Sequence, residues 1–112
     1  MKYAIPVSGG VLSAHFGHCE QFALIDVDEK DKKILRKEMV PAPAHQPGLL
    51  PEWLSRQGVN VVIAGGMGSR AQDLFNQSGI NVLIGAPSDD PEKIIMNYLS
   101  DNLVAGDNIC DH

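Results

Sequence analysis

The chain has 112 residues, of which 44% are hydrophobic and 21% charged, as expected for one soluble globular domain. Its formal net charge is -5, and its lysines and arginines form no dense stripe, which argues against a nucleic-acid-binding surface. No apolar run approaches the ~20 residues of a membrane-spanning helix, and the N-terminus lacks a signal-peptide core, so we expect a cytoplasmic protein without membrane contact.

The first part of the chain is predicted to form three strands. Residues 2–7 (KYAIPV) are short and apolar enough for a buried strand. Residues 21–28 (QFALIDVD) are rich in apolar and β-branched side chains, and residues 33–40 follow after a polar turn. This connection is too short for a parallel crossover, so the second and third strands should form an antiparallel hairpin.

Helices and strands alternate in the next part. Apolar residues at helical spacing predict a helix over residues 49–57, with Gly58 as its stop. Residues 60–64 (NVVIA) form a continuous apolar strand, as expected when both faces are covered. Ser69 is then the predicted N-cap of a helix that runs to Ser78.

The last part adds one strand and one helix. Residues 80–84 are the fifth predicted strand. Asp90 before Pro91 combines a good cap with proline at the first helical position, which predicts a helix to about Leu103. Residues 105–112 form a flexible polar tail that contains cysteine and histidine.

The predicted elements follow the order β-β-β-α-β-α-β-α within a single domain of residues 1–112. Two antiparallel strands before alternating units favour an α/β fold with a mixed five-stranded sheet and helices on its faces. Right-handed crossovers would set the last two strands parallel to the first.

Histidine and cysteine concentrate in the loop between the first two strands. His15, His18 and Cys19 lie within five residues, and imidazole and thiolate suit iron–sulfur species, zinc and copper. Taken singly, each histidine is better explained by a hydrogen bond to the backbone, and Cys19 by packing in the core. Their concentration favours a ligand site.

Three further candidate ligands lie elsewhere in the chain. His45 stands in a proline-rich loop, and Cys110 and His112 stand two residues apart in the tail. The cysteines are better explained as free thiols or metal ligands than as a disulfide in a reducing cytosol. The alternatives are a solvated histidine at position 45 and a disordered terminus.

The segment Gly65-Gly66-Met67-Gly68-Ser69-Arg70 follows a buried strand. Glycine lets the backbone approach a ligand, and a helix start offers free N–H groups, so the segment favours an anionic ligand with Arg70 as a clamp. It is neither a G-x-G-x-x-G motif nor a P-loop, which gives nucleotide binding little support. A tight turn without a ligand, with Met67 filling a gap, is the alternative.

Arrangements typical of enzymes are sparse. No serine lies in a G-x-S-x-G motif, and helix capping accounts for the paired carboxylates at Asp89 and Asp90. Cys19 beside His18 would need a turn to act as a nucleophile with its base, since neighbours along a strand point to opposite sides. The sequence therefore favours binding over catalysis.

Three motifs occur together along the chain: Ser13-x-His15-Phe16-Gly17, then Val59-x-Val61-Val62-Ile63-x-Gly65-Gly66-Met67-Gly68-x-x-Ala71, then Gly79-Ile80-x-Val82 with Gly85-Ala86. In combination they resemble the dinitrogenase iron–molybdenum cofactor biosynthesis family, the NifX-like cofactor-carrier domain. The resemblance implies a three-layer ribonuclease-H-like fold. It also implies binding of an iron–sulfur or iron–molybdenum-type cluster, without catalysis by the domain.

The resemblance also assigns roles to individual residues. His15 falls in the H-F-G loop of the family, residues 65–68 form its glycine turn, and His45 matches a histidine before the first helix. Cys110 and His112 match the terminal Cys/His cluster. The neighbours His18 and Cys19 are this sequence's own addition.

These observations predict a carrier or store for a metal cluster or its precursor, with a donor or acceptor protein as a further partner. The cluster would lie where the H-F-G loop, the His45 loop and the glycine turn converge. Two alternatives stay open: a regulatory interaction module that uses the same surface without metal, and a small enzyme that uses Cys19.

Overall fold

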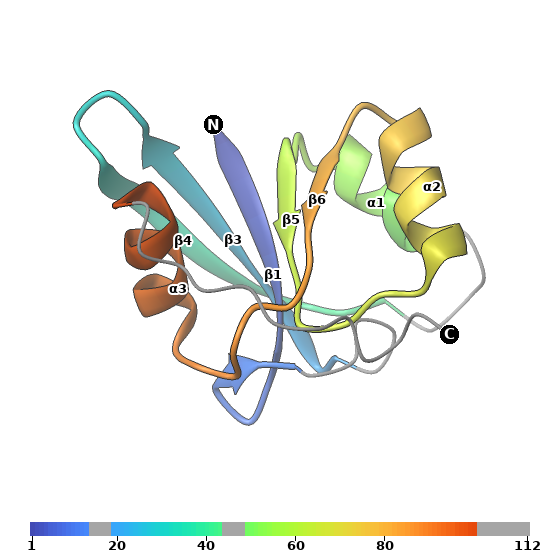
Figure 1. Ribbon diagram of the computed structural model, residues 1–112, viewed down its shortest axis with the longest axis horizontal. Helices are drawn as coiled ribbons and strands as arrows, with labels where there is room; N and C mark the ends of the chain where they lie inside the picture. The colour runs from blue at the N-terminus through green and yellow to red at the C-terminus, as the bar shows by residue number, and fades with distance from the viewer. Residues whose placement is uncertain (14–18, 44–48, 101–112) are drawn as a thin grey trace.

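The structure is a computed structural model that describes residues 1–13, 19–43 and 49–100. It contains one mixed six-stranded sheet with the strand order β4-β3-β1-β5-β6, and the short β2 pairs with β1 (Figure 1). The elements are β1 (Lys2–Ser8), β2 (Val11–Leu12), β3 (Gln21–Asp28), β4 (Lys33–Pro41), α1 (Leu49–Arg56), β5 (Val61–Ile63), α2 (Ser69–Gln77), β6 (Asn81–Leu83) and α3 (Pro91–Leu99).

The antiparallel half of the sheet confirms the predicted hairpin. β3 pairs antiparallel with both β1 and β4, and its bounds are those expected from the sequence. Asp28 closes the β3–β4 turn, because its Oδ1 accepts the backbone N–H groups of Lys30 at 3.0 Å and Asp31 at 3.1 Å. A register shift between Asp26 and Val27 leaves Leu35 of β4 as an extra, bulged residue.

The other half of the sheet confirms the predicted parallel direction of the last two strands. β5 pairs parallel with β1, and β6 pairs parallel with β5. Both strands are three residues long, shorter than the expected strands over 60–64 and 80–84. Parallel strands end at the same side of a sheet. The side where β1, β5 and β6 end, at Ser8, Ile63 and Leu83, is here called the carboxyl edge, together with the turns that follow.

The expected five-stranded sheet was wrong by one strand. β2 falls in the stretch that was predicted as loop, and it pairs antiparallel with β1 through Val7 with Leu12 and Ser8 with Val11. Gly9 and Gly10 make the intervening turn with φ angles of +63° and +85°, which glycine adopts without steric cost. A two-residue strand carries no periodicity, so the sequence pattern could not indicate it.

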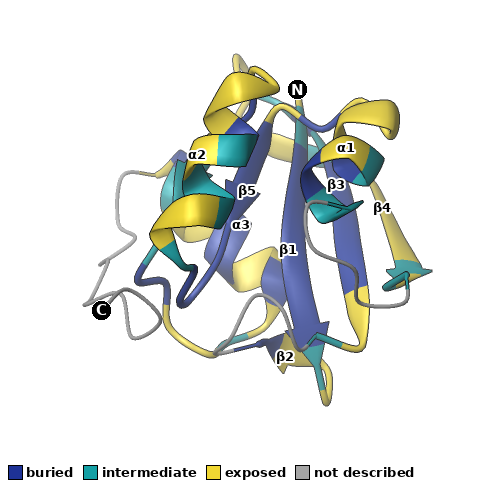
Figure 2. Cartoon of the chain, turned by 90° about the vertical axis from the view of Figure 1, so that its right-hand side faces the viewer, coloured by how far each residue is buried: buried dark blue, intermediate teal, exposed yellow. Residues whose placement is uncertain are grey.

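Helices cover both faces of the sheet, and each face has its own core (Figures 1 and 2). On one face Ile94 and Ile95 of α3 join Tyr3, Ile5 and other side chains of the central strands. On the other face, α1 and α2 contribute side chains such as Leu54 and Phe75. The assignment of this layering to the ribonuclease-H-like class stays a prediction.

β1 is the centre of the molecule. Its residues from Tyr3 to Val7 are all buried, alternating between the two cores, which Figure 2 shows as a continuous dark strand. Complete burial of one large apolar side chain contributes about 1.5–3 kcal/mol, so this strand supports both layers. Within the described residues, no helix is both long and apolar enough to cross a membrane.

The helix caps agree only partly with the sequence prediction. Asp90 caps α3 as expected, since its Oδ1 accepts the N–H of Glu92 at 2.8 Å. The prediction that Ser69 is an N-cap was wrong: Gly68 occupies that position, and Ser69 is the first helical residue. α3 ends at Leu99, and the expected continuation to Leu103 lies outside the described residues.

Candidate functional site

Only one of the six predicted metal ligands falls within the described residues, namely Cys19. The other five lie outside them: His15, His18, His45, Cys110 and His112. The predicted tail over 105–112 lies outside them as well. By contrast, the structure describes the whole glycine segment from Gly65 to Arg70, which supplies most of the described residues of the candidate site.

Both ends of the H-F-G loop are attached to the end of β1. On one side, the Ser13 N–H donates to the Pro6 carbonyl at 2.8 Å. On the other side, the Glu20 N–H donates to the Val7 carbonyl at 3.0 Å and to the Ser8 Oγ at 3.3 Å. The sequence between these two attachments therefore begins and ends at the carboxyl edge.

The start of the His45 loop is tied to the same place. The Ala42 N–H donates to the Glu20 carbonyl at 3.0 Å. Glu20 in turn accepts the Gly9 N–H on its Oε1 at 2.8 Å. A single residue thus connects the β1–β2 turn, the end of the H-F-G loop and the start of the His45 loop.

Cys19 lies half-buried at this position. It packs against the core of the α1 and α2 face, to which Met67 also belongs. Burial raises the pKa of the Cys19 thiol to about 11, because the thiolate loses solvation. The free protein therefore holds a neutral thiol at neutral pH, and metal ligation would have to displace its proton.

The glycine turn is fastened to the segment that follows β6. The Ala64 N–H donates to the Leu83 carbonyl at 2.8 Å, and the Gly85 N–H donates to the Gly65 carbonyl at 2.8 Å. The parallel ladder thus continues past both strands. Gly85 has a φ of +80°, a conformation that side chains rarely adopt, so glycine is required where this second segment turns.

Burial divides the predicted glycine segment into two parts. Gly65, Gly66 and Met67 are buried, and the Met67 side chain is 0% exposed and packs in the core. Gly68 is half-exposed, and Ser69 and Arg70 are exposed. The accessible part of the segment is therefore the first turn of α2, while Met67 fills space beneath it.

The N-terminus of α2 is the positive end of the helix dipole. Its cap makes no side-chain hydrogen bond, and its first turn contains no acidic residue. The first intrahelical bond runs from the Gln72 N–H to the Gly68 carbonyl at 3.2 Å, so the N–H groups of Ser69 and Arg70 have no acceptor within the helix. Together with the helix dipole, they form a favourable place for an anion.

Gln72 fixes this turn, a role that no sequence motif indicates. Its side-chain Nε2 donates to the Met67 carbonyl at 2.9 Å. The bond holds the glycine turn against the first turn of the helix. The available sequence signal was a glutamine in the first turns of a helix that directly follows a glycine-rich turn, because its side chain can reach back to that turn.

A metal centre at this edge requires ligands from beyond the described residues. Among residues 1–13, 19–43 and 49–100, no three histidine, cysteine or acidic side chains gather closely enough to hold a metal ion. The described part supplies backbone N–H groups, one guanidinium and one thiol. It can therefore hold an anion and contribute a single soft ligand.

Comparisons with known proteins agree with this architecture. An uncharacterized protein of Methanocaldococcus jannaschii is 34% identical over 87 residues, covering 73% of this chain and 72% of that protein. The crystal structure of PH0822 superposes with a TM-score of 0.86 at 28% identity and covers 94% of each chain. The apo form of the orange protein from Desulfovibrio gigas has the same fold, with a TM-score of 0.74 at 19% identity over 96% of this chain and 93% of that one.

A family assignment follows from the sequence match. The sequence profile described as "Dinitrogenase iron-molybdenum cofactor" matches residues 1–101 of the 112-residue chain. This match confirms the resemblance that the H-F-G loop and glycine-turn motifs indicated. The chain therefore belongs to the dinitrogenase iron–molybdenum cofactor family.

Proposed function

We propose that this protein binds and carries, or stores, an iron–sulfur or iron–molybdenum-type cluster or its precursor in the cytoplasm, without catalysing a reaction. Family membership supports a role in the biosynthesis or carriage of that cofactor. The observation that carries the proposal is the uncapped N-terminus of α2 at the carboxyl edge. Metal–sulfur clusters bear negative charge on sulfide and thiolate, which this helix start would stabilise.

The proposed binding has two components. The first is electrostatic: the N–H groups of the first turn of α2 and the Arg70 guanidinium would hydrogen-bond sulfides or carboxylates of the cargo. The second is ligation by soft side chains, for which Cys19 is the described candidate. The remaining proposed ligands belong to the H-F-G loop, the His45 loop and the tail, namely His15, His18, His45, Cys110 and His112.

Metal loading under anaerobic conditions tests the proposal. The purified protein is incubated with iron–sulfur and thiomolybdate species, and bound metal and the absorption spectrum are measured. We expect stoichiometric metal with a charge-transfer band. A variant with His15, Cys19 and Cys110 replaced by alanine should lose the band if side chains ligate the cluster. Absence of metal uptake under every condition would overturn the proposal.

A matched pair of variants tests the electrostatic component. Arg70→Gln removes the exposed cation beside the helix start, and Lys30→Gln removes an equally exposed cation from the β3–β4 turn. That turn follows β3, which runs antiparallel to β1, so it lies at the end of the sheet opposite the carboxyl edge. We expect weaker cargo binding for Arg70→Gln only. Equal losses in both variants would indicate a general effect of net charge.

A regulatory interaction module is the second candidate, because the described residues contain no group of three metal-ligating side chains. In that case the same surface would contact a protein partner without metal. The metal-loading experiment separates the two functions, since the module predicts no metal uptake and co-purification of a second polypeptide. A donor or acceptor protein that binds only the loaded form would instead support the carrier.

A further inference from the structure

Exposed apolar side chains gather on β4 and the neighbouring α3. β4 is the edge strand, and within the described residues no strand pairs with its outer side. Leu35 and Met39 on β4 are 61% and 39% exposed, and Met96 on the adjoining α3 is 40% exposed. These are three of the five large hydrophobic side chains that are exposed in the described chain.

The order of side chains along β4 is complementary to itself. If two copies of this strand lie antiparallel about Lys37, Arg36 of each copy stands opposite Glu38 of the other. The same alignment places Leu35 opposite Met39, so that the exposed apolar side chains meet. Arg36 and Glu38 already lie on one face of the strand, with Nη2 and Oε2 3.7 Å apart within a single chain.

We propose that β4 pairs with the β4 strand of a second copy of this chain, antiparallel and centred on Lys37. The pairing would form a two-fold symmetric dimer in which two sheets become continuous. Four charges, Arg36 and Glu38 from each copy, then alternate in sign across the interface, which favours this register over its neighbours.

The backbone of β4 has the phase that this register requires. The Ala42 N–H donates to the carbonyl of Glu20, the residue before β3. From there, β3 and β4 pair without a shift as far as Asp26 opposite Arg36. In an antiparallel ladder every second residue bonds to the same neighbour, so Lys37 and Met39 direct their N–H and C=O groups to the open side. Two copies of Lys37 at the dyad then exchange a pair of hydrogen bonds.

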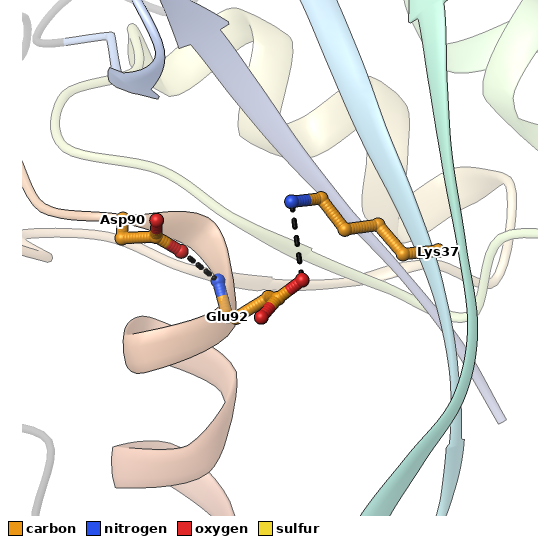
Figure 3. A network of polar contacts seen from close by, with 3 residues as sticks. All are labelled: Lys37, Asp90 and Glu92. Carbon is orange, nitrogen blue, oxygen red and sulfur yellow. Dashed lines mark hydrogen bonds and ion pairs between the residues drawn. The ribbon is translucent and has the colours of Figure 1, made fainter.

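The two Lys37 side chains that meet at the two-fold axis each have an acidic partner within their own chain. Lys37 Nζ lies 3.2 Å from Glu92 Oε1 at the start of α3 (Figure 3). Asp90 in turn caps the same helix by accepting the Glu92 N–H. Each Lys37 is therefore drawn toward its own α3, which reduces its repulsion from the second copy.

The structure also limits the strength of the dimer. The bulge at Leu35 interrupts the regular ladder on one side, and Pro41 lacks an N–H to donate on the other. Few backbone hydrogen bonds would therefore join the two strands, and the dimer should dissociate when the protein is diluted. β4 and β6 are the two outermost strands of the sheet, so pairing through β4 leaves the ends of β5 and β6 at the carboxyl edge uncovered in both copies (Figure 1).

Charge reversal across the interface tests the register. Arg36→Glu or Glu38→Arg turns two attractive pairs per dimer into two repulsive ones, and we expect the dissociation constant to rise about tenfold or more. The two single variants, when mixed, form complementary pairs with each other, so a heterodimer should appear. The double variant R36E/E38R restores complementarity within one chain and should dimerise like the native protein.

Sedimentation equilibrium over a wide range of concentrations provides the measurement. Lys30→Glu makes the same charge change as Arg36→Glu in the β3–β4 turn, outside the segment from Leu35 to Met39 that would pair, so it is the control and should dimerise normally. Circular dichroism of each variant verifies folding. A native chain that stays monomeric at every concentration overturns the proposal. Single variants that dimerise like the native chain overturn it too, since the interface then lies elsewhere.

Discussion

Replacing Gly68 with aspartate should stabilise the fold and weaken cargo binding at the same time. Gly68 is the N-cap of α2, with φ -63° and ψ 151°, a backbone conformation that aspartate adopts without strain. Aspartate would accept an N–H of the first helical turn and complement the helix dipole. The cap itself contributes a few tenths of a kcal/mol over glycine, and the charge about 0.3–1 kcal/mol. The free energy of unfolding should therefore rise by about 0.5–1.4 kcal/mol.

The same carboxylate would occupy the place that the proposed cargo needs. Loss of one charge-assisted hydrogen bond costs about 1.5–3 kcal/mol, so binding of a thiomolybdate or iron–sulfur species should weaken about tenfold or more. Gly68→Asn is the matched control, because asparagine caps without a negative charge and should retain more binding. Urea denaturation gives the stability, and metal analysis after gel filtration gives the binding.

Two results would refute this reasoning. If neither substitution raises the free energy of unfolding, the N–H groups of the first turn of α2 already have acceptors in the native protein. If Gly68→Asp stabilises the protein and leaves cargo binding unchanged, the helix start is free but does not hold the cargo. The first result concerns the fold of the glycine turn, and the second concerns its function.

Three further predictions concern single side chains. In a variant with the other cysteine replaced by serine, Cys19 should react with iodoacetamide at pH 8 roughly a hundredfold more slowly in the folded protein than in the urea-unfolded protein. The reason is that burial raises the pKa of its thiol from 9.0 to about 11, and equal rates would contradict this. Tyr3→Phe should lower the free energy of unfolding by about 0.5–1.5 kcal/mol, since it loses the 3.0 Å bond to Glu29; a neutral effect would show that water replaces it. Leu54→Ala at its fully buried site should lower the free energy of unfolding by about 2–5 kcal/mol. Leu35→Ala at its exposed site should change that free energy little in a dilute monomer, and similar losses in both variants would contradict the assigned burial.

The sequence predicted the arrangement of strands well, because the relevant signals are local or topological. The polar turn after Asp28 is too short for anything but a hairpin, whereas the helices between the later strands provide the crossover connections that parallel strands need. The N-cap of α2 was different. Ser69 and Gly68 are both acceptable caps by residue type, and only the backbone angles decide between them.

The candidate site was only partly predictable for a similar reason. Motifs identified the glycine turn, but not which of its residues reach the surface. Met67 is buried because the chain folds under the start of α2 there, a tertiary effect that no local pattern records. Gln72 was missed because its role depends on reaching back to the Met67 carbonyl.

The unequal strand lengths give the two halves of the sheet different resistance to local opening. β1, β3 and β4 have seven to nine residues each, whereas β5 and β6 have three. Fewer ladder bonds must break to release β6, so its amide protons should exchange with solvent faster than those of β3. Under the proposed function, this difference would let the carboxyl edge loosen for a bulky cargo while the β1–β3–β4 meander stays closed.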